Sequence, residues 1–308
     1  MKSDANTMMS NTKQSYNQNI EKFRSYSALF SRMSLLPVIE DNDFSLLNIK
    51  IHRYDKNKIG KSFTTYLEYL MYAYTELCKN RQCEYIYKNT LINLLVKEYG
   101  TKESVIFNEF HVGNSVADIV LFNGTSKAFE IKTELDSDKR LDSQLSDYFK
   151  IFKESYIVTH ESLVEKYKEA NESVGIIALA VKQRKLILKT IRKATENKNI
   201  DVNVLMRSIR TNEYRSIIEN FYGALPDVSS FDMFETCKSM MKFIPSDKLH
   251  WLFLNEMKKR KSNTAFLKSY INELRQFCLC THLDKSEYEQ LFTKLNNPIN
   301  LKLCTIHI

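Results

Sequence analysis

The feature that most constrains this chain is a pair of short, strand-like segments separated by a turn signal. Residues 116–122 (Val-Ala-Asp-Ile-Val-Leu-Phe) are followed by Asn123-Gly124 and then by residues 128–132 (Ala-Phe-Glu-Ile-Lys). Branched and aromatic residues favour strands, and Asn-Gly is a frequent hairpin turn. We therefore predict a β-hairpin with Asp118 on one arm and Glu130 and Lys132 on the other.

The length of the hairpin loop decides which side chains share a face, because side chains alternate along a strand. A two-residue loop pairs Asp118 with Phe129 and turns Glu130 to the opposite face. A three-residue loop, residues 123–125, pairs Phe122 with Ser126 and Asp118 with Glu130. We predict the three-residue loop, which gathers Asp118, Glu130 and Lys132 on one face. The other face is then apolar and carries Ile119, Leu121, Phe129 and Ile131.

A Glu-x-Lys triplet alone is a weak signal in this chain, because it also occurs at residues 196–198 and 256–258. The first of these copies lies in a polar run and the second in a segment with helical periodicity. Only Glu130 lies in an apolar strand pattern with a partner acid on the preceding strand. Two opposed carboxylates repel each other, and a bound cation would remove that repulsion. A hairpin whose charged groups merely face water is the alternative that the triplet alone favours.

The segments around the hairpin have a defined order of helix, three strands, helix and strand. Apolar residues at helical intervals end at Gly100, a helix-terminating residue, and residues 105–112 form a first strand before the hairpin. A second amphipathic helix begins near residue 141, and residues 156–159 form the next strand. The two helices are marked by Tyr87, Leu91, Leu94, Leu95 and Tyr99 and by Leu141, Leu145, Tyr148, Phe149 and Phe152.

That order, with Asp118, Glu130 and Lys132 in these places, resembles the PD-(D/E)xK nuclease superfamily, the fold of many restriction endonucleases and RecB-like nucleases. More closely, it is similar to a group of largely uncharacterised bacterial proteins built on that core. The resemblance covers residues 84–193, and its motifs are short. Ala117 stands where the proline of the eponymous Pro-Asp would be, a departure that many members share.

Three further residues match elements of the superfamily. Gln144 and Tyr148, four residues apart after the lysine, match the Gln-x-x-x-Tyr element of RecB-like members. Glu109, on the strand before Asp118, matches an extra upstream glutamate. The resemblance implies an α/β fold with a restriction-endonuclease-like core, in which a mixed central sheet is flanked by helices. N-terminal helices and an all-α C-terminal domain complete the expected architecture.

The residues and the resemblance together predict metal-dependent hydrolysis of a phosphodiester. Asp118 and Glu130 are the predicted ligands of Mg²⁺ or Mn²⁺, with Glu109 joining through a second ion or a bound water. Lys132 would orient or help to deprotonate the attacking water. Gln144 would contact phosphate or orient Lys132, and Tyr148 would buttress this group at the nucleic acid.

The expected substrate is DNA rather than RNA, because most members of the fold act on DNA. Defence against foreign DNA, or maintenance of a mobile element, is the setting that analogy suggests. Two alternatives stay open: a non-catalytic nucleic-acid-binding or adaptor protein on the same fold, and an RNA-directed nuclease. A homodimer, and a partner protein bound through the C-terminal helical domain, are also left open.

The charge of the chain favours a polyanionic partner. It carries 45 Lys and Arg against 37 Asp and Glu, a net charge of +8. Lys182, Arg184 and Lys185 cluster beside a predicted strand and are candidate nucleic-acid contacts. The sequence contains no run of 18 apolar residues and its start lacks the apolar core of a signal peptide. We therefore expect a cytoplasmic protein without a membrane partner.

The chain divides into four predicted segments. Residues 1–17 are expected to be disordered or frayed, 18–83 to form a helical extension, 84–193 the nuclease-like core and 194–308 a helical C-terminal domain. Pro37 is expected to end a helix over residues 20–36, and a stronger helix is expected over 63–77. Strands are predicted over 174–181 and 185–191. Further helices are predicted over 201–221, 230–243, 246–259, 263–277 and 284–295, the last with a capping box at Asp284 and Glu287.

Overall fold

The computed structural model describes residues 18–169, 172–182 and 185–301, apart from the side chain of Lys185. The predicted disordered segment 1–17 and the predicted nucleic-acid contact Arg184 lie outside these residues. The chain forms two compact units: unit 1 combines Met1–Asn89 with Tyr270–Ile308, and unit 2 is Thr90–Ser269. The sequence-based borders fell after residues 83 and 193 instead. Unit 2 contains every residue of the predicted site.

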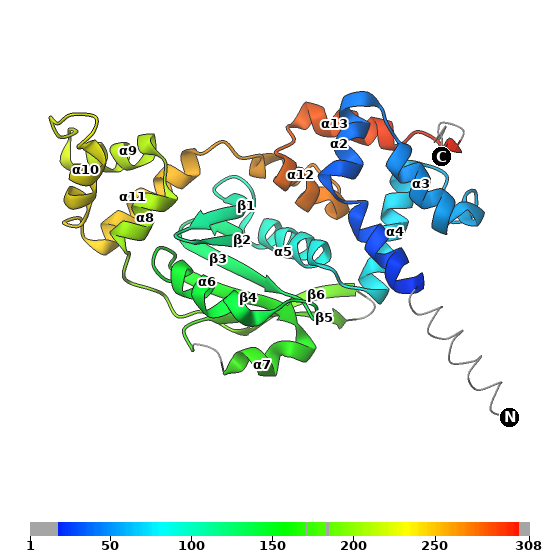
Figure 1. The fold of residues 1–308 in the computed structure, drawn as a ribbon, viewed down its shortest axis with the longest axis horizontal. Helices are drawn as coiled ribbons and strands as arrows, with labels where there is room; N and C mark the ends of the chain where they lie inside the picture. The colour runs from blue at the N-terminus through cyan, green and yellow to red at the C-terminus, as the bar shows by residue number, and fades with distance from the viewer. Residues whose placement is uncertain (1–17, 170–171, 183–184, 302–308) are drawn as a thin grey trace. The chain divides into compact units, whose positions relative to one another are not determined.

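Unit 2 is built on a six-stranded mixed sheet in which the strands lie in chain order (Figure 1). The first three strands and the last two are antiparallel neighbours, whereas β3, β4 and β5 run parallel. The α/β class and the predicted strands are confirmed. The strands are β1 Val105–Val112, β2 Ser115–Phe122, β3 Ser126–Lys132, β4 Glu154–His160, β5 Gly175–Lys182 and β6 Lys185–Arg192.

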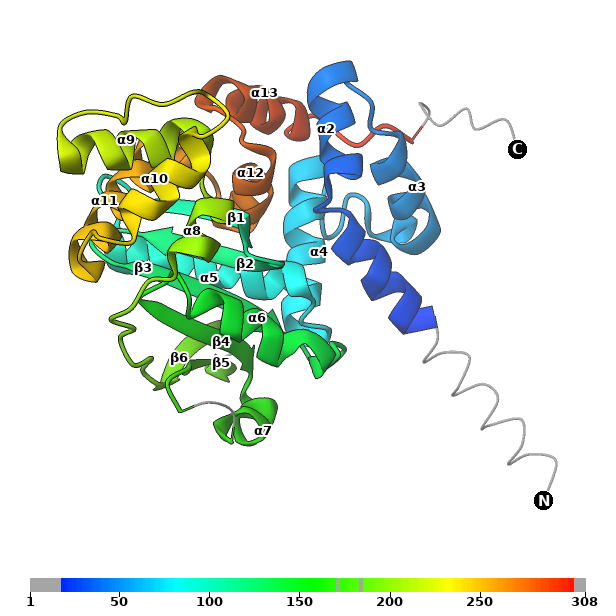
Figure 2. The ribbon, with the colours of Figure 1, turned by 60° about the vertical axis from the view of Figure 1, so that its left-hand side comes forward.

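Helices cover both faces of the sheet (Figures 1 and 2). On one face, the Phe122 ring of β2 lies 5.9 Å from the Phe152 ring after α6 and 5.5 Å from the Phe253 ring of α11. On the other face, the Lys127 ammonium of β3 lies 5.8 Å from the ring of Tyr99, the last residue of α5. The helices of unit 2 are the end of α5 Glu84–Tyr99, then α6 Leu141–Tyr148, α7 Val164–Lys168, α8 Val202–Ser208, α9 Thr211–Tyr222, α10 Met233–Met241 and α11 Ser246–Lys259.

Two predicted helices of the C-terminal half are wrong. The helix expected over residues 201–221 is divided into α8 and α9, because the Glu213 carboxylate accepts the Arg210 N–H at 2.7 Å and caps a new helix. The helix expected over 263–277 is replaced by 3-10 turns at Thr264–Phe266 and Asn272–Leu274 and by α12 Arg275–Thr281. There the Thr264 hydroxyl instead accepts the Ile106 N–H of β1, at 2.9 Å.

Unit 1 is helical. A helix over residues 18–28 ends before α2, so Pro37 lies inside α2 instead of ending the first helix as predicted. The predicted capping box of α13 is confirmed, since the Glu287 N–H donates to Asp284 and the Asp284 N–H to Glu287. The remaining segments of unit 1 are α2 Arg32–Asp41, α3 Ser45–Tyr54, α4 Tyr66–Asn80, α12 and α13 Lys285–Leu295.

The last described residues of the chain return to the first helices of unit 1. The Ile299 N–H donates to the Thr64 carbonyl at 2.9 Å, and the Asn48 amide donates to the Asn300 carbonyl at 3.1 Å. Helix α13 also packs against α2. Unit 1 is therefore completed by both ends of the described chain. In residues 18–169, 172–182 and 185–301, no helix has the length and apolar character that crossing a membrane requires.

Candidate functional site

The β2–β3 hairpin has the predicted three-residue loop. Phe122 is paired with Ser126, and the Asn123 N–H donates to the Thr125 carbonyl at 3.1 Å. The predicted apolar face is buried, with Ile119, Leu121, Phe129 and Ile131 at most 4% exposed. The predicted register is therefore confirmed over the paired part of the hairpin.

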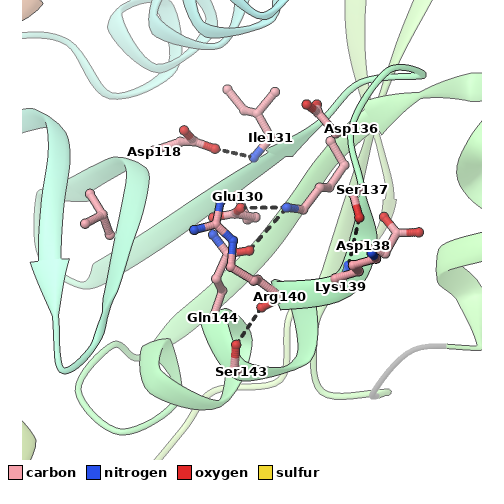
Figure 3. Close-up of polar contacts among 12 residues, drawn as sticks. Asp118, Glu130, Ile131, Asp136, Ser137, Asp138, Lys139, Arg140, Ser143 and Gln144 are labelled. Carbon is pink, nitrogen blue, oxygen red and sulfur yellow. Dashed lines mark hydrogen bonds and ion pairs between the residues drawn. The ribbon is translucent and has the colours of Figure 1, made fainter.

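Strands β2 and β3 separate where the acids begin. The last pair of the ladder is Ile119 with Phe129, and the next positions hold Asp118 and Glu130. Beyond this point the β2–β3 ladder ends, and side chains form hydrogen bonds with backbone groups of the two strands instead. The Ile131 N–H donates to the Asp118 carboxylate at 2.8 Å (Figure 3), and the Tyr148 hydroxyl lies 2.9 Å from the Val116 carbonyl.

Glu130 lies at the centre of a buried series of polar side chains, the polar chain, which joins it to Lys132, Gln144 and Tyr148. Its carboxylate is 3% exposed, and its two oxygens lie 3.0 Å from the Lys132 ammonium and 2.6 Å from the Tyr148 hydroxyl. Lys132 is 6% exposed and donates to the Gln144 side-chain oxygen at 3.2 Å. Four predicted site residues, two from β3 and two from α6, are thus joined by direct contacts.

The charges of this site oppose one another. Burial raises the pKa of Glu130, and the neighbouring negative charge of Asp118 raises it further. The hydrogen bond from Tyr148 and the positive charge of Lys132 act in the opposite direction without cancelling the rise. Burial and the nearness of Glu130 likewise raise the pKa of Tyr148. Ionisation of Glu130 is therefore unfavourable at this buried position beside Asp118.

Neighbouring elements hold the polar chain in place. Gln144 and Tyr148 are four residues apart, so they project from the same face of α6 towards β3. Lys132 is paired with Thr159 of the parallel strand β4, and the Thr159 hydroxyl donates to the Lys132 carbonyl at 2.8 Å. The Asp136 carboxylate accepts the Thr133 N–H at 2.7 Å and closes the turn that follows.

The other predicted site residues lie outside the polar chain. Glu109 is exposed on β1, opposite Asp118 in the register of β1 and β2. Lys182 is exposed at the end of β5, at the same sheet edge as Lys132, because β3, β4 and β5 are parallel. Lys185 begins β6, and its side chain is among the undescribed parts.

Sequence reasoning missed two parts of the site. Tyr148 was predicted at the nucleic acid, but it is 0% exposed and touches Glu130 and the Val116 carbonyl. The hydrogen bonds of the Ile131 N–H and the Val116 carbonyl were also missed.

Asp118 and Glu130 are the side chains that could hold a metal ion here. Their donors are all oxygen, the type that Mg²⁺ prefers, and Mg²⁺ is often bound by only one or two carboxylates together with waters and substrate phosphates. Within the described ranges, no group of three or more His, Cys, Asp or Glu side chains is arranged to hold a metal. Any ion at this pair would therefore need further oxygens from water or substrate.

Fold and site together define an α/β protein with a mixed six-stranded sheet and a buried carboxylate, lysine and glutamine cluster where two strands separate. The chain belongs to the family described as Bacteriophage P4 protein cII, which it matches over residues 78–278. That match includes all of unit 2 and hence the whole cluster.

The chain is similar to a curated phage protein and, more weakly, to one solved structure. Protein cII of Enterobacteria phage P4 is 31% identical over 143 residues, which are 44% of this chain and 52% of that protein. The chain therefore spans about half the length of this relative. A protein of unknown function from Silicibacter pomeroyi has a similar structure at a TM-score of 0.31 and 14% identity, covering 44% of this chain and 88% of that one.

Proposed function

We propose that this chain is a metal-dependent nuclease that hydrolyses phosphodiester bonds, in DNA rather than RNA, on a restriction-endonuclease-like core of the PD-(D/E)xK type. The observation that carries the proposal is the separation of β2 from β3 at Asp118 and Glu130. It leaves the Asp118 carboxylate near enough to raise the pKa of Glu130, with Lys132 3.0 Å from Glu130. This is an unfavourable arrangement for a purely structural strand pair, and a useful one for binding a cation beside a phosphate.

The residues fit a divalent cation by their chemistry. The charge of Asp118 contributes to the raised pKa of Glu130, and a cation near both would favour the ionised forms and remove that conflict. Asp118 and Glu130 would hold the ion. When bound, Mg²⁺ or Mn²⁺ would supply Lewis-acid stabilisation of the phosphate and a lower pKa of the attacking water.

The side chains around the pair have separable roles. The Lys132 ammonium would stabilise negative charge on the phosphate and orient the attacking water. Gln144 holds Lys132 by accepting from its ammonium at 3.2 Å. Tyr148 fixes Glu130 from the opposite side at 2.6 Å. Because all four are joined in one chain of contacts, displacing any one of them should disturb the others.

The proposed substrate and setting rest on charge and relatedness. The net charge of +8 and the exposed Lys182 at the same sheet edge favour a polyanion. The PD-(D/E)xK resemblance favours DNA. Protein cII, the relative of this chain, comes from Enterobacteria phage P4, which suits a role in a mobile element or in defence against foreign DNA.

The test is cleavage by the purified full chain. Supercoiled, linear and single-stranded DNA and a matched RNA are incubated with Mg²⁺, with Mn²⁺ or with a chelator, beside Asp118→Asn prepared in the same way. We expect cutting of DNA that requires the metal and is lost in the variant. Metal-independent cutting, or equal cutting by Asp118→Asn, would contradict the proposal. Nicking of circular DNA would exclude a strict exonuclease.

A non-catalytic nucleic-acid-binding protein on the same fold is the second candidate. The observation that favours it is that both oxygens of Glu130 already contact donors, Lys132 and Tyr148. Titration of Mn²⁺ into the wild type and Asp118→Ala separates the two candidates. Binding lost in the variant supports the nuclease, whereas DNA binding without any metal binding supports the alternative.

A further inference from the structure

One residue beside the site has an unusual backbone conformation. Among the described residues, three non-glycine residues have a left-handed backbone: Asn42, Glu109 and His282, with φ between 55° and 57°. Asn42 and His282 end helices α2 and α12, where this conformation is common. Glu109 lies inside strand β1, where it has no such explanation. A left-handed conformation is unfavourable for residues with a Cβ atom, so the surrounding structure must impose it.

At Glu109 the strand reverses the faces to which its side chains point. Residues three apart in a regular strand point to opposite faces. Phe107 and Phe110 nevertheless pack on the same side, with ring centroids 6.1 and 5.8 Å from the ring of Phe122. Strand β1 therefore changes face between these two phenylalanines, at the segment that contains Glu109.

The reversal is matched on the neighbouring strand. The register of β1 and β2 is the same before and after Glu109, but the pair that Glu109 would form with Asp118 is missing. On β2, Ala117 and Val120 are three residues apart and belong to the same buried cluster. Strand β2 thus also changes face, at the segment that contains Asp118. That change accompanies the turn of the Asp118 carboxylate to the Ile131 N–H, 2.8 Å away.

We propose that Glu109 is a positioning residue for Asp118 and that it acts through its left-handed backbone, not through its carboxylate. The left-handed turn breaks the β1–β2 pairing at one position. The β1–β2 ladder does not include a pair at Asp118, whose carboxylate reaches across to β3. An extended residue at position 109 would restore the regular pair and draw Asp118 back into it.

The first test uses variants that differ in their tolerance of a left-handed backbone. Glycine adopts it readily and asparagine adopts it more easily than most residues, whereas β-branched valine rarely does. Glu109→Gly and Glu109→Asn should keep the Ile131 amide as protected from hydrogen exchange as in the wild type. Glu109→Val should raise the hydrogen exchange of the Ile131 amide about tenfold. A valine strained in the left-handed conformation shifts the equilibrium towards the locally open state by about that factor. Asp118→Ala should raise the exchange too, and His111→Val, an exposed position on the same strand, should not.

A second comparison holds even if the valine variant does not fold. Replacing glycine by alanine in a strand normally stabilises it, but where φ is positive the order is reversed. Glu109→Gly should therefore melt at a higher temperature than Glu109→Ala. Equal exchange at Ile131 in the valine variant and the wild type, or a higher melting temperature for Glu109→Ala, would overturn the proposal.

Cleavage adds a third readout, which rests on the proposed function. Glu109→Gln and Glu109→Gly should cut DNA at the wild-type rate, and Glu109→Val about tenfold more slowly. Equal losses in the glutamine, glycine and valine variants would show that the carboxylate itself is needed, which overturns the backbone role. If the wild type cuts nothing, the proposed function fails, while hydrogen exchange and melting still decide the role of Glu109.

Discussion

Two of the three Glu-x-Lys copies in unit 2 lie in different settings. Glu130 and Lys132 are 3% and 6% exposed and pair with each other at 3.0 Å. The Glu196 side chain is 62% exposed and pairs instead with Lys153 at 2.9 Å, while Lys198 is exposed. Burial and Asp118 raise the pKa of Glu130, whereas the hydrogen bond from Lys153 lowers the pKa of Glu196.

The contrast shows what makes a Glu-x-Lys triplet informative. In both copies the glutamate has a lysine partner, so an ion pair alone does not distinguish them. Glu196 also has a second carboxylate nearby, that of Asp247, so the difference lies in burial: Glu130 is shielded from water and Glu196 is exposed to it. The two settings should therefore respond differently to mutation and to pH.

The largest difference should appear when each lysine loses its charge. Lys132→Met keeps the length of the side chain but removes the cation, and we expect cleavage to fall at least about a hundredfold, the typical effect of removing a group that stabilises transition-state charge. Lys198→Met is the matched control and should cut at the wild-type rate. Similar rates in the two variants would remove the distinction between the triplets.

Acid should destabilise the surroundings of Glu196 through His250. Burial, together with the positive charge of Lys153, lowers the pKa of His250 to about 4, from about 6.5 when unfolded. The unfolded chain therefore gains a proton below about pH 6.5, and the folded protein does so only near pH 4. The stabilisation is present above pH 6.5 and is lost as the pH falls, by on the order of 2–3 kcal/mol at pH 4.

Urea unfolding of the wild type and His250→Gln between pH 7 and pH 4 measures this loss. The variant should show a correspondingly smaller decrease in the free energy of unfolding. Glu130 should act in the opposite direction, since its raised pKa gives a stabilisation that is lost as the pH rises. Parallel pH profiles for the wild type and His250→Gln would show that His250 does not cause the loss of stability in acid.

Removal of the Tyr148 hydroxyl should have a smaller effect on the free energy of unfolding. Tyr148→Phe removes the hydroxyl beside the buried Glu130 carboxylate and the Val116 carbonyl, and should lower the free energy of unfolding by about 1–2 kcal/mol. The control is Tyr222→Phe, whose hydroxyl donates to the Met240 carbonyl from a ring that is 42% exposed. Thermal unfolding should show a much smaller change there. Equal changes would mean that Tyr148 contributes nothing particular to the site.

The smallest effect should follow from the exposed glutamate. Glu196→Gln removes an ion pair at the surface and should change the free energy of unfolding by at most about 0.5 kcal/mol, because water screens such pairs. Salt should reduce even that difference, which urea unfolding at low and high ionic strength can measure. A change above about 1 kcal/mol would show that this region is less solvated than its exposure indicates.

Features fixed by local sequence were predictable. The loop of the hairpin followed from Asn123-Gly124 and the parity of the flanking side chains, and the predicted strand over residues 105–112 agrees with β1. Helix α5 ends at Tyr99, before Gly100 at φ 72°, where glycine avoids the strain of a Cβ atom. In each case the physical cause lies within a few residues of its effect.

Features set by distant residues were not predictable. The periodicity of residues 263–277 favoured a helix, but the Ser262 hydroxyl donates to the Ile106 carbonyl and the Ile106 N–H donates to the Thr264 hydroxyl, which directs that segment along β1. Pro37 was expected to end a helix, yet the buried Leu35 and Val38 keep α2 intact around it. The left-handed Glu109 has no signal at all, because glutamate rarely adopts this conformation and only tertiary packing can impose it.

Several side chains of the candidate site were predictable, but the contacts that they make were not. Asp118, Glu130, Lys132 and Gln144 followed from pattern and resemblance. That Asp118 would bond to the Ile131 N–H, and Tyr148 to Glu130, depends on how far two strands diverge. Where the strands diverge, Tyr148 of α6 lies beside Val116 of β2 and Glu130 of β3, a contact between distant segments that no single segment encodes.

The return of the last described residues to Thr64 and Asn48 has a consequence for synthesis on the ribosome. Unit 2 has all of its residues once Ser269 has left the exit tunnel. Helices α2 and α4 are made first, but α13, which packs on both, is made after unit 2 is complete. The nascent chain therefore carries an unfinished first unit while the inserted one folds, and a pause or truncation after residue 269 would expose the apolar faces that α13 normally covers.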